Sequence, residues 1–290
     1  MDYERIEYSP IIDRKPFKLP NDARLALWII VNVEKWDINA PMPRPLAPAP
    51  AGASVIPDIP NYGWYDYGMR VGFWRIKEVL DRHQIKGVLS LNAAVIDYNP
   101  RIVEECLKSD WEILAHGYFQ RVLNVEKDQR EVIRKTIERI KDFTGKAPIG
   151  WMSPGLNQTF ETPDFLAEEG IEYIADWVND DEPYPIKVKN GSLIAVPYTV
   201  ELNDIPAHLI LHENSSGFYD RARYEFDTLY KEGEKRAKIM TLTTHPYVTG
   251  VAHRCGFFDK FLEYAKQHDD ILFMRGFEIY EWYKKFVGQA

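Results

Sequence analysis

Hydrophobic positions along the chain fall into short apolar runs that alternate with amphipathic stretches. The runs are rich in Val, Ile and Leu, as in strands that are buried on both faces. The stretches between them repeat apolar residues every three or four positions, as one face of a helix does; Met69, Phe73, Ile76 and Leu80 are an example. This repeated alternation favours a parallel sheet covered by helices.

The expected elements divide the chain into many short units. The expected strands cover residues 25–33, 87–91, 111–115, 149–152, 171–176, 193–197, 239–243 and 271–273, with a further extended stretch at 207–212. The expected helices cover residues 69–80, 101–108, 127–143, 162–169, 219–236, 257–267 and 277–286. A chain of 290 residues is long enough for one large α/β domain. We therefore predict a single catalytic domain over residues 1–290, built as a distorted (β/α) barrel with about seven to eight parallel strands.

One proline-rich segment interrupts the alternation. Seven of the 19 prolines fall between residues 41 and 60. Since proline has no backbone N–H, this segment cannot form an interior strand or a helix. We expect a surface insertion at about residues 40–62, between the first strand and the first helix. A lid over the site or a contact between subunits is the alternative interpretation.

The net charge, the longest apolar run and the number of cysteines indicate which partners and which cellular compartment to expect. A net charge of −8 argues against nucleic acid, which needs clustered Lys and Arg. The longest apolar run, residues 25–31, is too short to span a bilayer, and the polar first residues contain no signal-peptide core. With only Cys106 and Cys255, a disulfide framework is not expected. We expect a cytoplasmic protein that acts on a small molecule and binds neither nucleic acid nor membrane.

Polar and ionisable residues stand at the ends of several expected strands. In an α/β barrel the chemistry lies at the carboxyl ends of the strands, so these residues are the first candidates for a site. They are Glu34, Asn92, His116, Ser153, Asp176, Asn203 with Asp204, and His245. One such residue would equally suit a structural hydrogen bond, and their coincidence favours a functional site.

Two fragments resemble the first two catalytic motifs of the polysaccharide deacetylase superfamily. Residues 31–34 read VNVE and residues 115–120 read AHGYFQ, each at the end of a strand-like run. In that superfamily an Asp pair ends the first strand, and a His-x-x-x-His element follows a later strand. Here Glu34 holds the acidic position and Gln120 holds the second histidine position. The resemblance therefore implies a site that lacks one ligand of the family's metal.

A third fragment is similar to the late Leu-x-x-His motif of that superfamily, whose histidine is the general acid. Residues 240–246 read MTLTTHP and place His245 at the end of a strand. An imidazole with a pKa of about 6.5 suits protonation of a leaving nitrogen at neutral pH. Asp176 is similar to an acidic residue of the family, and we expect it to orient this imidazole. Glu34 is the candidate base, with His116 assisting it.

Further stretches resemble an intracellular branch of the superfamily that includes metal-independent allantoinase and cyclic imide hydrolases. They are residues 67–75, 148–155, 176–184 and 196–204, and the similarity extends over roughly residues 20–285. The resemblance implies the deacetylase-type barrel and a homo-oligomer, a dimer or a tetramer.

The expected substrate-binding residues lie in or beside these motifs. Asn32 shares a strand face with Glu34 and, with backbone N–H groups near Gly117, is placed to stabilise an oxyanion. Arg70 is expected to hold a substrate carbonyl or carboxylate, although a structural salt bridge is the alternative. The full set is Asn32, Arg70, Gly117, Gln120, Trp151 and Ser153.

A metal is not expected in this site. A hydrolytic zinc ion needs three protein ligands and one open position. Glu34 and His116 supply two, and the neutral amide of Gln120 is a poor third. We predict no cofactor, with zinc held through Glu34 and His116 as the alternative. His208 and His212 share one face of the expected extended stretch, and one of them is expected to line the pocket rather than to bind metal.

Three functions remain open at this point. The first is a hydrolase of a carbon–nitrogen bond in a small cyclic amide, imide or ureide. The second is a zinc-dependent deacetylase of an N-acetylated sugar or peptidoglycan fragment. Such an enzyme would need a second histidine to bind the metal and would normally be exported. The third is a catalytically inactive binding protein on the same fold, for which His116, His245 and Asp176 would serve no purpose.

Overall fold

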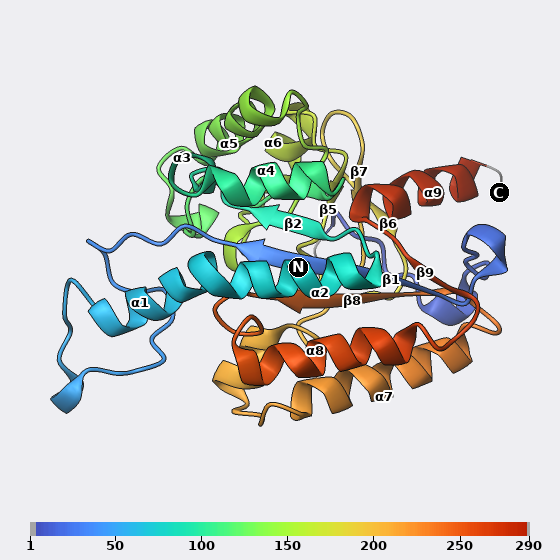
Figure 1. The fold of residues 1–290 in the computed structure, drawn as a ribbon. Helices are drawn as coiled ribbons and strands as arrows, with labels where there is room; N and C mark the ends of the chain where they lie inside the picture. The colour runs from blue at the N-terminus through green and yellow to red at the C-terminus, as the bar shows by residue number, and fades with distance from the viewer. Residues whose placement is uncertain (1–3, 289–290) are drawn as a thin grey trace.

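The chain folds as a curled sheet of mostly parallel strands with helices packed around it (Figure 1). This computed structural model describes residues 4–288. Within them, one sheet has nine strands in the order β6-β7-β5-β4-β3-β2-β1-β8, and β9 pairs with β1. Its pairs are parallel apart from β6 with β7. The predicted distorted α/β barrel is confirmed as a half-barrel, open between β8 and the β6–β7 edge.

The strands are short apart from β1 and β8. Their bounds are β1 Leu25–Val33, β2 Val88–Leu91, β3 Glu112–Ala115, β4 Gly150–Trp151, β5 Tyr173–Ile174, β6 Tyr184–Ile186, β7 Leu193–Ala195, β8 Lys238–Thr244 and β9 Ile271–Phe273.

The helices follow the expected alternation, but α1 begins at Ile59, inside the proline-rich segment, so the expectation that no helix forms there is wrong at its last residues. Pro60 is tolerated because it lies in the first turn, where a backbone N–H has no helical partner. Their bounds are α1 Ile59–Tyr67, α2 Phe73–His83, α3 Val95–Tyr98, α4 Pro100–Lys108, α5 Gln129–Thr144, α6 Thr162–Glu168, α7 Gly217–Glu232, α8 Ala252–Ala265 and α9 Gly276–Gly288. A π-helical turn, Gly68–Gly72, joins α1 to α2, and another covers Pro206–Ile210.

Strand β1 pairs with three other strands and is buried along its whole length. Strand β8 pairs with one edge of β1, from Leu25 to Val31. The other edge is shared: β9 pairs with its first residues and β2 with its last. Since β1 has packed side chains on both of its faces, an apolar sequence suits it, which explains the apolar run at residues 25–31.

The helices bury the apolar stripes that their sequences predict. In α2, Phe73, Ile76 and Leu80 face the core. Helices α7 and α8 lie side by side along the β8 side of the sheet (Figure 1). Between them the rings of Phe226 and Phe261 pack edge to face, with their centroids 6.3 Å apart. No helix within residues 4–288 is both long and apolar enough to cross a lipid bilayer.

The expected extended stretch at 207–212 is wrong. Residues Pro206–Ile210 form a π-helical turn instead. Pro206 has the backbone angle that a first helical position needs, and the Asn203 side chain accepts the N–H of Ile205 at 2.9 Å just before it. Local capping therefore outweighs the β-rich composition of this stretch.

Candidate active site

A cavity of about 170 Å³ opens at the carboxyl ends of the central strands. The register explains its place: Val31 of β1 lies beside Thr244 of β8, and Leu91 of β2 beside Ala115 of β3. The residues that follow these pairs leave the sheet at one edge. The cavity is lined by polar side chains from strand ends and loops: Asn32, Glu34, Arg44, His116, Gln120 and His245. Five of these six are predicted site residues.

Glu34 is buried and faces three donors. Its Oε2 accepts hydrogen bonds from Trp36 Nε1 at 2.8 Å and from the Tyr247 hydroxyl at 3.0 Å. Its Oε1 lies 3.4 Å from Nε2 of His245. Burial alone would raise the pKa of this carboxyl, but the hydrogen bond and the attraction from His245 outweigh it and lower the pKa to about 2. Glu34 is therefore ionised at neutral pH.

His245 lies between Glu34 and a second buried carboxylate, Asp204. Nδ1 of His245 lies 2.6 Å from Oδ1 of Asp204. Burial alone would lower the pKa of His245, but the attraction to Asp204 and the hydrogen bonds to both carboxylates raise it to about 9. His245 is therefore a cation at neutral pH, with Nε2–H directed toward Glu34 at the cavity.

Asp204 is fixed by its other oxygen. Its Oδ2 accepts the backbone N–H of His245 at 2.7 Å, the Thr249 hydroxyl at 2.6 Å and the Thr249 N–H at 3.2 Å. Both oxygens are thus satisfied within the loop that carries His245, and Asp204 holds the orientation of the imidazole.

His116 has the opposite character. Its Nδ1 lies 2.7 Å from the carbonyl oxygen of Met152, a contact that only an Nδ1–H donor satisfies. Burial lowers the pKa of His116 to about 4, despite the nearby charge of Glu34. The ring is therefore neutral at pH 7, and its Nε2 carries a lone pair.

Two amide oxygens in the cavity lining have no partner. Within residues 4–288, neither Oδ1 of Asn32 nor Oε1 of Gln120 has a hydrogen bond, and both atoms are buried. An unpaired buried acceptor costs roughly 1–3 kcal/mol, so these oxygens suit a ligand that brings N–H or O–H donors.

The predicted partner of His245 is wrong. Asp176 contacts Ser153 instead, accepting its N–H at 2.6 Å and its hydroxyl at 2.7 Å, and it also accepts from Gln158. Asp204 takes the place at His245. The sequence marked Asp204 among the strand-end residues but gave no reason to choose it over Asp176, because only the fold shows which loop packs beside β8.

The other expected substrate residues fall outside the cavity lining. Arg70 is a surface residue, 76% exposed, and pairs with Asp66 at 2.7 Å, so its predicted contact with substrate is wrong and the salt-bridge alternative holds. Trp151 and Ser153 are buried beneath the cavity, where the indole N–H donates to the Ser153 hydroxyl at 3.0 Å. Gly117 adopts a left-handed φ of 73° and is likewise not part of the lining.

Neither His208, in the π-helical turn, nor His212, just after it, is part of the cavity lining. His208 is buried with Nδ1 3.1 Å from the carbonyl of Glu213, and His212 is exposed with a φ of 55°. The expectation that one of them lines the pocket is therefore wrong.

Sequence reasoning missed three residues that shape the site, Trp36, Arg44 and Tyr247, and it did not pair Asp204 with His245. Trp36 and Tyr247 donate to Glu34. Arg44 lines the cavity from the proline-rich segment. A single arginine among many prolines was the only signal for it in the sequence.

The residues at the site fit a zinc ion poorly. Between residues 4 and 288, no group of three or more His, Cys, Asp or Glu side chains is arranged to hold a metal. Both oxygens of Glu34 face donors, one of them the cationic His245, and Gln120 offers only a neutral amide. A reaction without a metal stays a prediction for this site.

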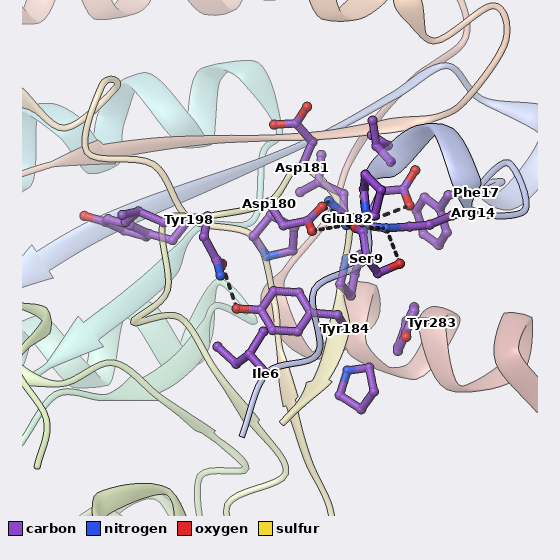
Figure 2. Close-up of a pocket in the computed structure, with 18 of the residues that line it drawn as sticks. Ile6, Ser9, Arg14, Phe17, Asp180, Asp181, Glu182, Tyr184, Tyr198 and Tyr283 are labelled. Carbon is purple, nitrogen blue, oxygen red and sulfur yellow. Dashed lines mark hydrogen bonds and ion pairs between the residues drawn. The ribbon is translucent and has the colours of Figure 1, made fainter. Parts of the chain in front are cut away.

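A larger cavity, about 950 Å³, lies between the N-terminal segment and residues 178–185 (Figure 2). Its arginine, Arg14, is already paired with Asp180 at 2.6 Å and with Glu182 at 3.6 Å. The smaller cavity holds His116 and the two unpaired amides, so it is the candidate active site.

Comparisons with known proteins agree with this architecture. Residues 62–174 match the model of the polysaccharide deacetylase family. A putative polysaccharide deacetylase of Schizosaccharomyces pombe is 27% identical over 290 residues, covering 90% of this chain and 89% of that protein. A peptidoglycan deacetylase of Helicobacter pylori is 25% identical over 194 residues, covering 55% of this chain and 66% of that protein.

Two solved structures share the fold over nearly the whole chain. A probable polysaccharide deacetylase from Pseudomonas aeruginosa superposes with a TM-score of 0.81 at 24% identity, covering 93% of this chain and 95% of that one. Puue allantoinase superposes with a TM-score of 0.80 at 23% identity, covering 95% and 97%. The residues that match the model of the polysaccharide deacetylase family, 62–174, contain β2, β3 and His116.

Proposed function

We propose that this protein is a hydrolase that opens the carbon–nitrogen bond of a small cyclic amide, imide or ureide without a metal. One observation carries the proposal: His245, held between two carboxylates, and His116, whose Nδ1 contacts a backbone carbonyl, line the same small cavity. These partners raise the pKa of His245 to about 9, and burial lowers that of His116 to about 4. Amide hydrolysis needs a proton acceptor for water and a proton donor for the leaving nitrogen, and these two histidines have those complementary states.

In the proposed reaction His116 Nε2 takes a proton from water as the water oxygen attacks the ring carbonyl. The Asn32 amide lies in the lining, where its N–H donates to the developing oxyanion. Collapse of the tetrahedral intermediate breaks the carbon–nitrogen bond, and His245 gives its Nε2 proton to the departing nitrogen. Return of the proton from His116 to His245 restores the resting state.

Glu34 serves here as the counter-ion of His245 rather than as the base. Its three donors leave no oxygen free to take a proton from water, and its pKa of about 2 makes it a weaker base than His116. His116, with a pKa of about 4, is itself a modest base. The site therefore suits imides and ureides, whose nitrogen leaves readily, better than a simple acetamide.

The size of the cavity supports a single ring over a glycan chain. Its volume of about 170 Å³ lies below the roughly 300 Å³ at which cavities for drug-sized ligands begin. The unpaired oxygens of Asn32 and Gln120 further favour a substrate that carries N–H groups, as ring ureides and imides do.

The test is turnover of a panel by the purified protein, with and without a chelator and with added zinc. The panel contains allantoin, succinimide, hydantoin, dihydrouracil and an N-acetylglucosamine oligomer. We expect opening of at least one ring that survives chelation, and a fall of about 10²–10⁴-fold in kcat for His245→Gln. Activity on the acetylated sugar alone, or only with zinc, would instead favour the deacetylase, and no turnover by a folded protein would favour a binding role.

A further inference from the structure

Arg44 is a cation at the cavity with no anionic partner of its own. It lines the cavity together with Glu34 and both histidines. No carboxylate in the part of the chain that the structure describes, residues 4–288, lies within 4.0 Å of its guanidinium nitrogens, although most arginines of that part have one. A guanidinium presents two parallel N–H donors that suit a carboxylate or phosphate group of a ligand.

The backbone that carries Arg44 is held in place by a buried asparagine. Asn61, only 1% exposed, accepts the N–H groups of Leu46 at 2.7 Å and Ala47 at 2.9 Å. Its own Nδ2 donates to the Ala47 carbonyl at 3.0 Å and to Asp58 at 2.7 Å. Arg44 therefore stands two residues from a fixed turn, which limits the conformational entropy lost when it binds a ligand.

The carboxylates inside the site form no direct ion pair with Arg44, although its charge is one of those that lower the pKa of Glu34. Glu34 faces Trp36, Tyr247 and His245, and Asp204 is satisfied by His245 and Thr249. The guanidinium is therefore left for a group that the ligand supplies. A carboxylate matches its planar pair of donors and is small enough to accompany one ring in this cavity.

We propose that the substrate is an anionic ring, a cyclic amide or ureide that carries a carboxylate, and that Arg44 binds this carboxylate. The inference rests on the proposed ring-opening function and names its substrate class. The ring N–H groups pair with Asn32 and Gln120, whose oxygens are unsatisfied. The carboxylate of the ring then lies beside the proline-rich segment. Through Arg44, this segment selects rings that carry a carboxylate over neutral rings.

The experiment compares matched neutral and carboxylated rings: dihydrouracil with dihydroorotate, and hydantoin with hydantoin-5-acetate. We expect the wild-type protein to open the carboxylated member of a pair with the higher kcat/KM. In Arg44→Met, kcat/KM for that member should fall roughly 10- to 100-fold, mainly through KM, as loss of a charged hydrogen-bond pair predicts. The neutral member should change less than about threefold, and Arg44→Lys should retain part of the preference.

Arg70→Met is the matched control, because Arg70 is a surface arginine paired with Asp66 and lies outside the cavity lining. Its kinetics should equal those of the wild type. Equal losses on neutral and carboxylated rings in Arg44→Met would overturn the inference and make Arg44 a long-range counter-charge for Glu34. A wild-type preference for the neutral rings would overturn it as well.

Failure of the proposed function gives a different result. If no ring is opened, binding of dihydroorotate and dihydrouracil, measured by calorimetry, still tests Arg44. Preferential binding of dihydroorotate that Arg44→Met abolishes would support the anionic site in a protein that is not a ring hydrolase. Equal binding or none would overturn it. Thermal melts of each variant verify that the protein is folded.

Discussion

At the scale of single residues, the two histidines of the site differ because of what their Nδ1 atoms contact. Nδ1 of His245 meets the carboxylate of Asp204, and Nδ1 of His116 meets the neutral carbonyl of Met152. Both rings are buried, so the partner of Nδ1 decides the direction in which the pKa shifts. A carboxylate stabilises the imidazolium cation, whereas a neutral carbonyl cannot offset the cost of removing that cation from water. A pKa of about 9 and one of about 4 follow.

Replacing Asp204 should remove the charge of His245 at neutral pH. In Asp204→Asn, burial dominates and the pKa of His245 falls, so the alkaline limb of the kcat/KM profile should move from about pH 9 to lower pH. At pH 8 we expect a loss of about 10²-fold, with part of the activity regained at lower pH. The measurement is the pH dependence of kcat/KM for the best ring substrate.

Asp176→Asn is the control for this variant. Asp176 is equally buried in a strand-end loop but contacts Ser153 and Gln158 rather than His245. Its alkaline limb should stay at the wild-type position. An unchanged limb in Asp204→Asn, or the same displacement in both variants, would show that Asp204 does not set the charge of His245.

At the scale of elements, the period of hydrophobic residues was enough to predict most strands and helices. Buried runs such as residues 25–33 leave little choice, since only a strand or helix in the core removes them from water. The stretch at 207–212 failed because its conformation depends on Pro206 and on the Asn203 side chain, and not on apolar content. The proline-rich segment was expected between β1 and the first helix, but its buried anchor Asn61 was not predictable from composition.

The contact between the turn before α2 and the loop after β8 gives an element-scale prediction. A Cβ on Gly72 would collide with the carbonyl of Pro246, next to His245. Gly72→Ala should therefore push the His245 loop away, lowering the free energy of unfolding by about 1–3 kcal/mol and reducing kcat. Denaturant unfolding and turnover measure the two effects.

Gly256→Ala separates this clash from the general effect of replacing a helical glycine. Gly256 lies within α8, and a Cβ there meets nothing within 4 Å. Alanine should stabilise this helix by roughly 0.5–1 kcal/mol without a change in kcat. If Gly72→Ala behaves like Gly256→Ala, the close approach does not position His245.

At the scale of the whole molecule, the open side of the half-barrel explains why the sequence did not identify Asp204 as the partner of His245. Residues 197–204 run beside β8: Pro197 accepts from the Thr241 hydroxyl at 2.8 Å, and Leu202 accepts from the Thr243 N–H at 2.9 Å. These contacts bring Asp204 against the end of β8, 41 residues away along the chain. The sequence predicts which polar residues stand at the end of each strand. Which of these residues contact each other, as Asp204 and His245 do, depends on how the sheet curls.

The same buried charges should make the stability of the whole protein depend on pH. The pKa of His245 rises from 6.5 to about 9 on folding, so its contribution is fully present below pH 6.5 and is lost as the pH rises through 9. Burial raises the pKa of Asp176 to about 6 and that of Glu112 to about 7. Ionisation of these two carboxyls also lowers the free energy of unfolding as the pH rises, but at lower pH than for His245. Between pH 7 and 9.5 the titration of His245 should therefore dominate among these groups.

We expect the free energy of unfolding of the wild type to fall by about 2.4 kcal/mol more than that of His245→Gln over this interval. Asp176 and Glu112 are present in both proteins, so their contributions cancel in the difference. Urea unfolding at several pH values gives the two slopes. His245→Gln should be less stable throughout, because it leaves Glu34 and Asp204 buried without their cation. Parallel slopes would mean that His245 is not charged in the folded protein, and the proposed proton donor would then be lost together with this prediction.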